Sequence, residues 1–440
     1  MEVEFDTKIL LSFVFIVFFG VVMRLYNVLV LQPKRLRKVF VFSLGNTQIL
    51  NLNQPDVVKE ITTCVSLDLG KPSYQQKDRG PLLGQGILTS NGAFWSRQRK
   101  ILAPELYMEK VKGMVNLITE STLILINSWK RVIEKDGTSA DVISRACFGS
   151  NYSRGEKIFL KLRHLQEAMS KKSLATGIPE MRYLPTKSNR EAWALEKEIR
   201  NLILQVVKER QEGTYEKDLL QMILEGAKNS NLSREAMDRF MVDNSKNIYL
   251  AGYETSAVSA TWCLMLLAAN PEWQDRVRAQ VLEICGGGMP DSDMVRKMKL
   301  LNMVIHEALR LYPPVPVISR EAFKDMKFGN IKVPREVNIW TMVLPLHTDP
   351  EIWGSDSYKF NPERYANGIS GACKNPFLYM PFGVGPRVCL GQNLAMVELK
   401  IVIGLVLSNY CFSISPKYIH SPTLRLVIEP QHGVNLLALV

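Results

Sequence analysis

The sequence predicts a mostly helical chain with a few short strands, preceded by one membrane-spanning helix. Residues 105–134 and 233–269 place apolar side chains at helical spacing over long stretches. Residues 9–31 form an apolar run of about 23 residues, which is long enough to cross a bilayer. Only short segments, residues 39–52 and the segment that starts at Val317, have the character of strands.

Composition and charge narrow the classes of protein. The chain has 440 residues, of which 46% are hydrophobic, so a large core is possible; length alone would suggest about three domains. The net charge of +12 suits an anionic membrane surface or an acidic protein partner. No basic run is interleaved with base-stacking aromatic residues, so no nucleic-acid partner is expected. Seven scattered cysteines without a Cys-x-x-Cys pair disfavour disulfides and zinc, and predict a reducing compartment.

The apolar run at the N-terminus predicts a signal anchor. Residues 2–6 include three acidic side chains and no small-residue cleavage site follows the run, which disfavours a cleaved signal peptide. The four basic side chains within residues 34–38 place the following chain in the cytoplasm. We therefore expect residues 1–38 to form the anchor with its basic flank, and residues 39–440 to form the catalytic domain.

The segment 92–104 predicts a helix that Pro104 interrupts. Trp95 and Arg99 are four residues apart, so they share one face of this helix. An indole N–H and a guanidinium on one face can both bind a carboxylate. The alternative interpretation is an ordinary amphipathic helix.

The middle of the predicted helix 233–269 is unusual. Gly252 lies inside it, where glycine is less favourable than alanine by about 1 kcal/mol. The hydroxyl of Thr255, which follows Glu254, can compete for backbone carbonyls, open the helix locally and leave room beside Gly252 for a small ligand. The alternative is a packing contact at a small residue.

A cysteine loop near the C-terminus carries the strongest chemical signal. It has the sequence Phe-Gly-Val-Gly-Pro-Arg-Val-Cys-Leu-Gly from Phe382 to Gly391, and an apolar, helix-forming run follows. Gly385 and Gly391 are expected to let the backbone turn tightly and aim N–H groups at the sulfur. The start of the next helix favours Cys389 as an anion, and Arg387 suits a carboxylate. Together with the flat Phe382 ring they predict a haem site; the alternative is a small buried apolar cysteine.

This loop resembles the cysteine loop of the cytochrome P450 superfamily. Over about residues 50–440, five motifs occur in the order of that family. They are Trp95 with Arg99, Ala251–Thr255, Glu307 with Arg310, Phe360–Arg364, and the cysteine loop. The resemblance implies the mostly helical haem-thiolate fold with a smaller β-rich lobe.

The resemblance also implies roles for individual residues. Haem b would be the cofactor, with Cys389 as the axial ligand of its iron. The residues expected to contact haem are Trp95, Arg99, Gly252, Arg320, Phe382, Gly385, Arg387 and Gly391. Glu254 and Thr255 would help to deliver protons during the activation of dioxygen. Glu307, Arg310 and Arg364 would form a buried structural triad under the cysteine loop.

The function implied is that of a monooxygenase anchored in the endoplasmic reticulum, with its catalytic domain facing the cytoplasm. It would insert one atom of O2 into a small hydrophobic substrate, with electrons from NADPH through a flavoprotein reductase. Residues 183–190 and 379–385 further resemble plant microsomal members that oxidise terpenoids, among them gibberellins.

Two alternatives remain open. A haem-thiolate isomerase or dehydratase would need no external electrons, although the pair Glu254 and Thr255 disfavours it. A non-catalytic remnant is the other alternative, because the chain departs from the family pattern. The resemblance implies that the proline-rich hinge, first helix and first strands after the anchor are missing, and that a segment is absent near residues 135–139.

Overall fold

The computed structural model describes residues 38–44, 47–136, 152–170, 184–212, 219–228 and 232–439. The chain divides into two units, residues 1–40 and residues 41–440. Within the described ranges, no helix has both the length and the apolar character of a membrane span. The expected anchor, residues 9–31, lies outside these ranges, so it stays a prediction.

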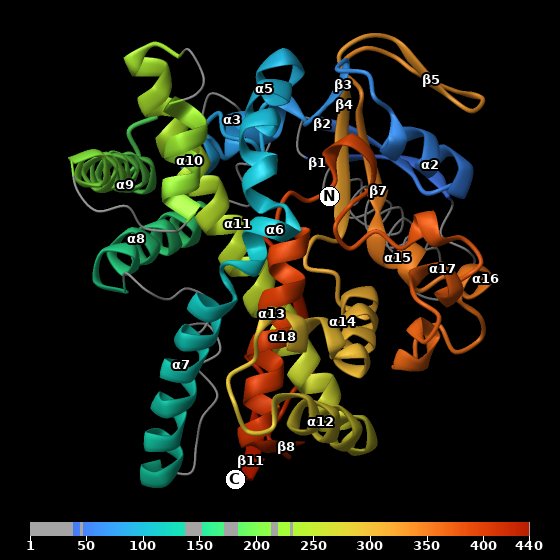
Figure 1. The fold of residues 1–440 in the computed structure, drawn as a ribbon. Helices are drawn as coiled ribbons and strands as arrows, with labels where there is room; N and C mark the ends of the chain where they lie inside the picture. Colours follow the sequence, from blue (N-terminus) through green and yellow to red (C-terminus); the bar gives the residue numbers. More distant parts are fainter. Residues whose placement is uncertain are drawn as a thin grey trace, which may run out of the picture. The chain divides into compact units, whose positions relative to one another are not determined.

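Helices make up most of the unit 41–440, as the sequence predicts (Figure 1). In its N-terminal half they are α2 Pro55–Thr63, α3 Ser73–Asp78, α4 Gly80–Leu83, α5 Gly92–Leu102, α6 Met108–Lys112, α7 Val115–Asp136, α8 Tyr152–Ser170, α9 Lys187–Glu212 and α10 Leu219–Lys228. Further along they are α11 Arg234–Ala269, α12 Pro271–Cys285, α13 Ser292–Lys297, α14 Lys299–Leu311, α15 Val343–His347, α16 Pro350–Trp353, α17 Ile369–Ala372 and α18 Gln392–Asn409. Short 3-10 helices are η2 Ala103–Leu106, η6 Pro362–Tyr365, η7 Pro376–Leu378 and η8 Gly385–Arg387.

The two long helices expected from periodicity have different outcomes. The helix over 233–269 is confirmed as α11, whose first turn is capped by the Ser233 hydroxyl accepting from the Ala236 N–H at 3.3 Å. The single helix expected over 105–134 is wrong in its first part. Gly113 ends α6, so the chain turns before α7 begins.

The main sheet has five strands in the order β1-β2-β7-β4-β3. Their bounds are β1 Val39–Leu44, β2 Thr47–Leu52, β3 Leu69–Gly70, β4 Val317–Ala322 and β7 Asn338–Met342. β2 runs parallel to β7, and β4 pairs antiparallel with β7 so that Arg320 lies opposite Ile339. The segments expected to be strands, 39–52 and the one starting at Val317, are therefore confirmed. Each of these five strands pairs with at least one neighbour in the sheet.

Three antiparallel pairs complete the strands that the structure describes. They are β5 Met326–Phe328 with β6 Ile331–Val333, β8 Cys411–Ile414 with β11 Leu436–Leu439, and β9 Pro422–Leu424 with β10 Ile428–Pro430.

The largest apolar core surrounds α11 and α18, which lie together in the centre of the helical part (Figure 1). Most apolar residues of both helices are buried, and each fully buried Val, Leu, Ile or Met side chain stabilises the fold by about 1.5–3 kcal/mol. A buried polar contact crosses the same interface, because the Ser256 hydroxyl donates to Oε2 of Glu398 at 2.7 Å. This packing places the start of α18, where the cysteine loop ends, against the middle of α11.

Candidate functional site

Cys389 lies in an irregular loop immediately before α18. The Cys389 N–H donates to the Phe382 carbonyl at 2.8 Å, which closes the loop on itself. The ring of Phe382 packs against the core that contains α18. Gly385 has φ 73°, and a Cβ there would overlap the Thr62 carbonyl oxygen at the end of α2. The expected need for glycine at this turn therefore has a definite steric cause.

Gly391 behaves differently from Gly385. Its φ is −87°, which any residue adopts, and a Cβ there would meet no protein atom within 4 Å. The chain does turn at Gly391, and its N–H is directed at the Cys389 sulfur as expected, but this turn does not require glycine. The space on this side of the cysteine loop is open, which suits a bound group beside Cys389, and the role of Gly391 in haem binding stays a prediction.

Replacing Gly385 with alanine should destabilise the cysteine loop, because the new Cβ meets backbone and φ is positive. We expect the free energy of unfolding of the haem-free chain to fall by about 1–3 kcal/mol, measured by denaturant titration. Gly391→Ala is the matched control, since the haem-free chain has room for its Cβ. Equal losses in both variants would contradict this account.

The environment of the Cys389 thiol combines accessibility with enclosure. The side chain is exposed, yet protein groups surround the sulfur on most sides. This burial raises the thiol pKa, and the Gly391 N–H and the charge of Arg99 act in the opposite direction. In the haem-free protein the net effect of these groups is a raised thiol pKa, and the anion expected from the start of the next helix stays a prediction for the haem-bound protein. Coordination to a metal ion deprotonates a thiol, so a bound iron would produce the thiolate that the surrounding protein groups do not favour.

Cationic side chains gather beside Trp95, next to the cysteine loop. The Arg387 guanidinium lies 4.0 Å from the Trp95 ring centroid, and that of Arg99 lies 5.8 Å from it. Arg320 reaches the same place from β4 and is only 6% exposed. Burial lowers the pKa of Arg320 to about 10; burial, together with Arg320 and Arg99, lowers that of Arg387 to about 10.

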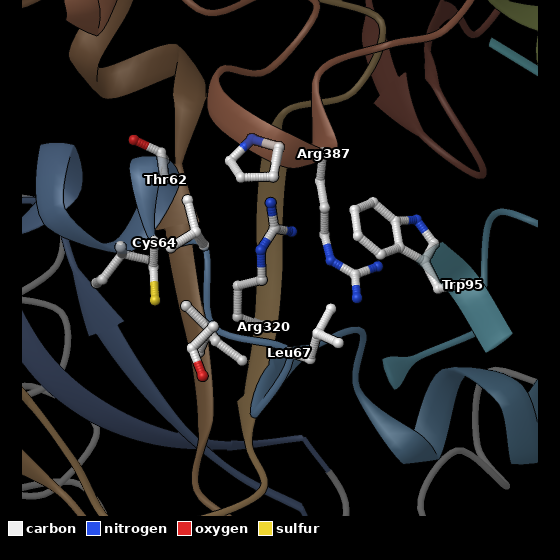
Figure 2. A pocket seen from close by; sticks show the side chains of 11 residues that line it. Thr62, Cys64, Leu67, Trp95, Arg320 and Arg387 are labelled. Atoms are coloured by element: carbon white, nitrogen blue, oxygen red, sulfur yellow. The ribbon is translucent and has the colours of Figure 1, made fainter. Parts of the chain in front are cut away.

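A pocket opens between these cations. Figure 2 shows the side chains of Arg320 and Arg387 projecting into it side by side, with Trp95 next to Arg387. It encloses about 290 Å³ that protein atoms do not fill, part of it open to solvent. Its other walls come mostly from α2 and the segment after it, including Thr62, Cys64 and Leu67.

Lys71 is a further cation of this cluster, which sequence reasoning missed. Burial, followed by the charges of Arg320 and Arg387, lowers its pKa to about 7. Its backbone is held by Asn91, whose Oδ1 accepts from the Lys71 N–H at 2.6 Å and whose Nδ2 donates to the Lys71 carbonyl at 2.9 Å. Lys71 belongs to none of the motifs, so nothing in the sequence alone indicated that it lies beside these arginines.

The cluster has an excess of positive charge. Among the described residues, no carboxylate forms an ion pair with Lys71, Arg99, Arg320 or Arg387. Crowded buried cations without counter-charges are unfavourable, so this arrangement fits a bound group with several negative charges. The two propionates of haem match that requirement, with Cys389 close to Arg99 for the iron.

The middle of α11 is the next part of the site. The Thr255 hydroxyl donates to the Ala251 carbonyl at 2.6 Å, but α11 stays helical throughout, so the local opening expected there is wrong. Between buried stretches of this helix, Gly252, Glu254 and Thr255 are partly exposed. Burial and the nearby Glu429 raise the pKa of Glu254, which Arg163 and a hydrogen bond from Gln166 oppose. Glu254 is therefore near groups of both α8 and β10.

The structure brings Glu307, Arg310 and Arg364 together in the interior. Glu307 receives two hydrogen bonds from Arg310, at 2.7 and 2.8 Å, and both side chains are 0% exposed. Nε of Arg364 lies 3.5 Å from Oε1 of Glu307. Terminal N–H groups of both arginines donate to backbone carbonyls, those of His347, Trp353, Asp356, Ser357 and Lys359. Nη2 of Arg364 also lies 2.5 Å from Oδ2 of Asp356, which forms a further ion pair.

His347 connects this network to the segment that leads into the cysteine loop. Its Nδ1 donates to the Arg310 carbonyl at 3.2 Å, and its Nε2 accepts from the Met380 N–H at 2.9 Å. Complete burial lowers the pKa of His347 to about 3, so the ring stays neutral and keeps both bonds. The triad thus supports the cysteine loop through backbone contacts.

A comparison with protein families agrees with this geometry. A family model described as Cytochrome P450 matches residues 8–435. This chain belongs to the cytochrome P450 family. It is an oxidoreductase of the monooxygenase type, and the family implies haem iron as its cofactor.

Similar P450 proteins come from plants. Cytochrome P450 714C2 of Oryza sativa subsp. japonica is 52% identical over 415 residues, which cover 91% of this chain and 80% of that protein. Cytochrome P450 714B3 of Zea mays is 47% identical over 413 residues, covering 90% and 77%. Cytochrome P450 714A2 of Arabidopsis thaliana is 44% identical over 426 residues, covering 91% and 81%. About a fifth of each relative thus has no aligned counterpart in this P450.

The P450 site predicted from sequence assembles from distant elements. Trp95 and Arg99 come from α5, Arg320 from β4, and Arg387 and Cys389 from the loop before α18. These residues surround one place and fit haem, whereas the triad lies apart from it in the interior. The contacts between these residues and haem stay predictions.

Proposed function

We propose that this P450 is anchored in the membrane of the endoplasmic reticulum and oxidises a small hydrophobic terpenoid, such as a gibberellin. Its electrons would come from NADPH through a flavoprotein reductase. The observation that carries the monooxygenase chemistry is the cysteine loop, which lies beside uncompensated cations and against the middle of α11. The substrate class rests on the resemblance of residues 379–385 to plant microsomal members of the family. The anchor rests on residues 9–31 with their basic flank.

Each residue of the site has its own role in the proposed reaction. Haem, when bound, supplies the activation of dioxygen. Cys389 would hold its iron, and Arg99, Arg320 and Arg387, with Lys71, would neutralise its propionates. Thr255 presents a hydroxyl on the exposed stretch of α11. Glu254, whose pKa is raised, can hold a proton near this stretch and release it.

Replacing Thr255 with alanine should separate electron consumption from product formation. The variant keeps the cations and Cys389, so it should bind haem, but it loses the hydroxyl that positions a proton. We expect product formed per NADPH consumed to fall by about a hundredfold, the lower end of the range for a lost acid–base group, with peroxide rising in compensation. Ser259→Ala, which removes a hydroxyl that donates to the Thr255 carbonyl at 2.7 Å, is the control. Unchanged coupling in Thr255→Ala would leave Thr255 with a packing role only.

The proposal is tested on the full chain in microsomes with a plant or yeast reductase. A carbon monoxide difference spectrum of the reduced protein should show thiolate-bound haem, and a gibberellin should be oxidised only with NADPH. Conversion without NADPH would favour the isomerase or dehydratase alternative. A haem-to-protein ratio far below one would favour a non-catalytic remnant. Release of the protein by a carbonate wash would contradict the anchor.

A further inference from the structure

Asn91 stands directly before α5, at the position where an asparagine side chain usually caps a helix. Its backbone is extended, with φ −134° and ψ 170°, as a cap requires, yet its side chain accepts no hydrogen bond from the first turn of α5. Such a cap typically contributes about 1 kcal/mol to stability. The Asn91 amide is therefore used elsewhere, and departures from a local rule are expected at functional positions.

The Asn91 amide connects two segments that are far apart in the sequence. Its Oδ1 accepts from the Lys71 N–H at 2.6 Å and from Nη2 of Arg387 at 3.2 Å. Its Nδ2 donates to the Lys71 carbonyl at 2.9 Å. One neutral side chain thus fixes both the backbone that follows β3 and the guanidinium of the residue two positions before Cys389.

The fit around this bridge is close on both sides. A Cβ on Gly70, at the end of β3, would overlap the Asn91 amide, so a larger residue there would displace it. On the other side, the Arg387 guanidinium lies 4.0 Å from the Trp95 ring centroid, and its Nη1 donates to the Ser90 carbonyl at 3.4 Å. The Asn91 amide therefore has a defined place beside the cysteine loop.

The bridge carries no charge, and this matters for the cation cluster. An aspartate has the same shape and could accept the same two bonds, but it would also form an ion pair with Arg387. Among the described residues, no carboxylate pairs with Lys71, Arg320 or Arg387. A carboxylate here would compensate part of the positive charge and weaken the attraction for a bound anion. The amide holds the cations and leaves their charge available.

We propose that Asn91 is a positioning residue for haem, which holds Lys71 and Arg387 in place for the propionates without compensating their charge. This rests on the proposed function, because it requires propionates beside these cations. Asn91 acts through the two cations and has no need to contact haem itself. Side chains that are already ordered bind an anionic group without the unfavourable entropy of ordering them. The effect is therefore specific to a ligand that carries the propionate charges.

The test compares haem with haem dimethyl ester, whose propionates are esterified and carry no charge. Each is titrated into the haem-free full chain, and the two dissociation constants are measured. Asn91→Ala removes the bridge, whereas Asn91→Asp keeps its shape and adds a negative charge. Ser90→Ala is the matched control, because its buried hydroxyl has no hydrogen-bond partner among the described residues.

We expect Asn91→Ala and Asn91→Asp each to weaken haem about tenfold relative to the dimethyl ester, which is the order of effect of one lost hydrogen bond or one opposing charge. Ser90→Ala should leave the ratio of the two dissociation constants unchanged. Equal weakening of haem and its ester would reduce Asn91 to a packing role and overturn the proposal. An unchanged ratio in Asn91→Asp would overturn it too.

A second measurement, on the haem-free chain, separates this proposal from the proposed function. Asn91→Asp should raise the free energy of unfolding in a denaturant titration, because its carboxylate relieves the repulsion between the cations. Asn91→Ala should lower it, because the bridge is lost. A value that is unchanged or lower in Asn91→Asp would overturn the proposal even if the parent binds no haem. A parent that binds no haem while both stability changes appear would contradict the proposed function instead.

Discussion

Replacing Cys389 with serine should abolish the spectrum of thiolate-bound haem. A serine hydroxyl is a much weaker ligand than a thiolate, so the iron would lose the bond that gives the spectrum its thiolate character. We expect the reduced carbon monoxide spectrum to lose its thiolate-type band and product formation to fall to background. Both are measured on the purified full chain.

Two other cysteines are suitable controls for Cys389→Ser. Cys373 follows α17, where burial raises its thiol pKa, and Cys411 begins β8. Neither lies in the cysteine loop, so Cys373→Ser and Cys411→Ser should keep the spectrum. A thiolate-type band that survives in Cys389→Ser would remove the basis for the haem assignment. Retained haem with a shifted band would still support it, since the cations around Trp95 would hold the propionates without the sulfur.

Replacing Glu307 with glutamine should have the largest effect on stability. The change leaves Arg310 as a buried cation without a counter-charge, and breaking a buried ion pair in this way is unfavourable by about 3–5 kcal/mol. Arg364 keeps its ion pair with the Asp356 carboxylate at 2.5 Å. Much of the stability of a typical domain, about 5–15 kcal/mol, would be lost. We expect a lower melting temperature and a lower haem-to-protein ratio, because His347 and Met380 transmit the disturbance to the cysteine loop.

The chain offers a matched control for Glu307→Gln at the same helical spacing. Glu109 and Lys112 on α6 also form an i, i+3 pair, at 3.0 Å, but the Glu109 side chain is 84% exposed. Glu109→Gln should change the free energy of unfolding by less than about 0.5 kcal/mol, because water screens exposed pairs. Similar losses in the two variants would show that burial of the triad does not determine its contribution.

The parts of this P450 that follow from sequence are those with a short-range signature. The cysteine loop and the Trp95–Arg99 pair each lie within about ten residues, so one local conformation brings their members near. The long α11 follows from its periodicity, with Ser233 as its cap. The contact of Arg364 with Glu307, 57 positions earlier in the chain, was accessible only through the resemblance to a family.

The remaining features depend on contacts that no local pattern encodes. Lys71 joins the cations only because Asn91 holds its backbone beside β4. The buried polar side chains of residues 243–247 on α11 appear in the sequence as ordinary hydrophilic residues. Their hydrogen-bond partners become visible only in the structure, where residues 81–88 lie against α11. The need for glycine at Gly391 was overestimated for a related reason, because its backbone angle is ordinary and only the open space around it, which depends on distant residues, distinguishes the position.

The backbone acceptors of the triad have a consequence for the evolution of this region. Arg310 and Arg364 bind the carbonyls of Trp353, Ser357 and Lys359, and a carbonyl is present whatever side chain the residue carries. Selection at these positions can therefore act on the path of the main chain while their side chains drift. A region of this kind can diverge widely between lineages and still support the same cysteine loop. The side chains that the network itself requires are Glu307, the two arginines that bind these carbonyls, and Asp356, whose carboxylate pairs with Arg364.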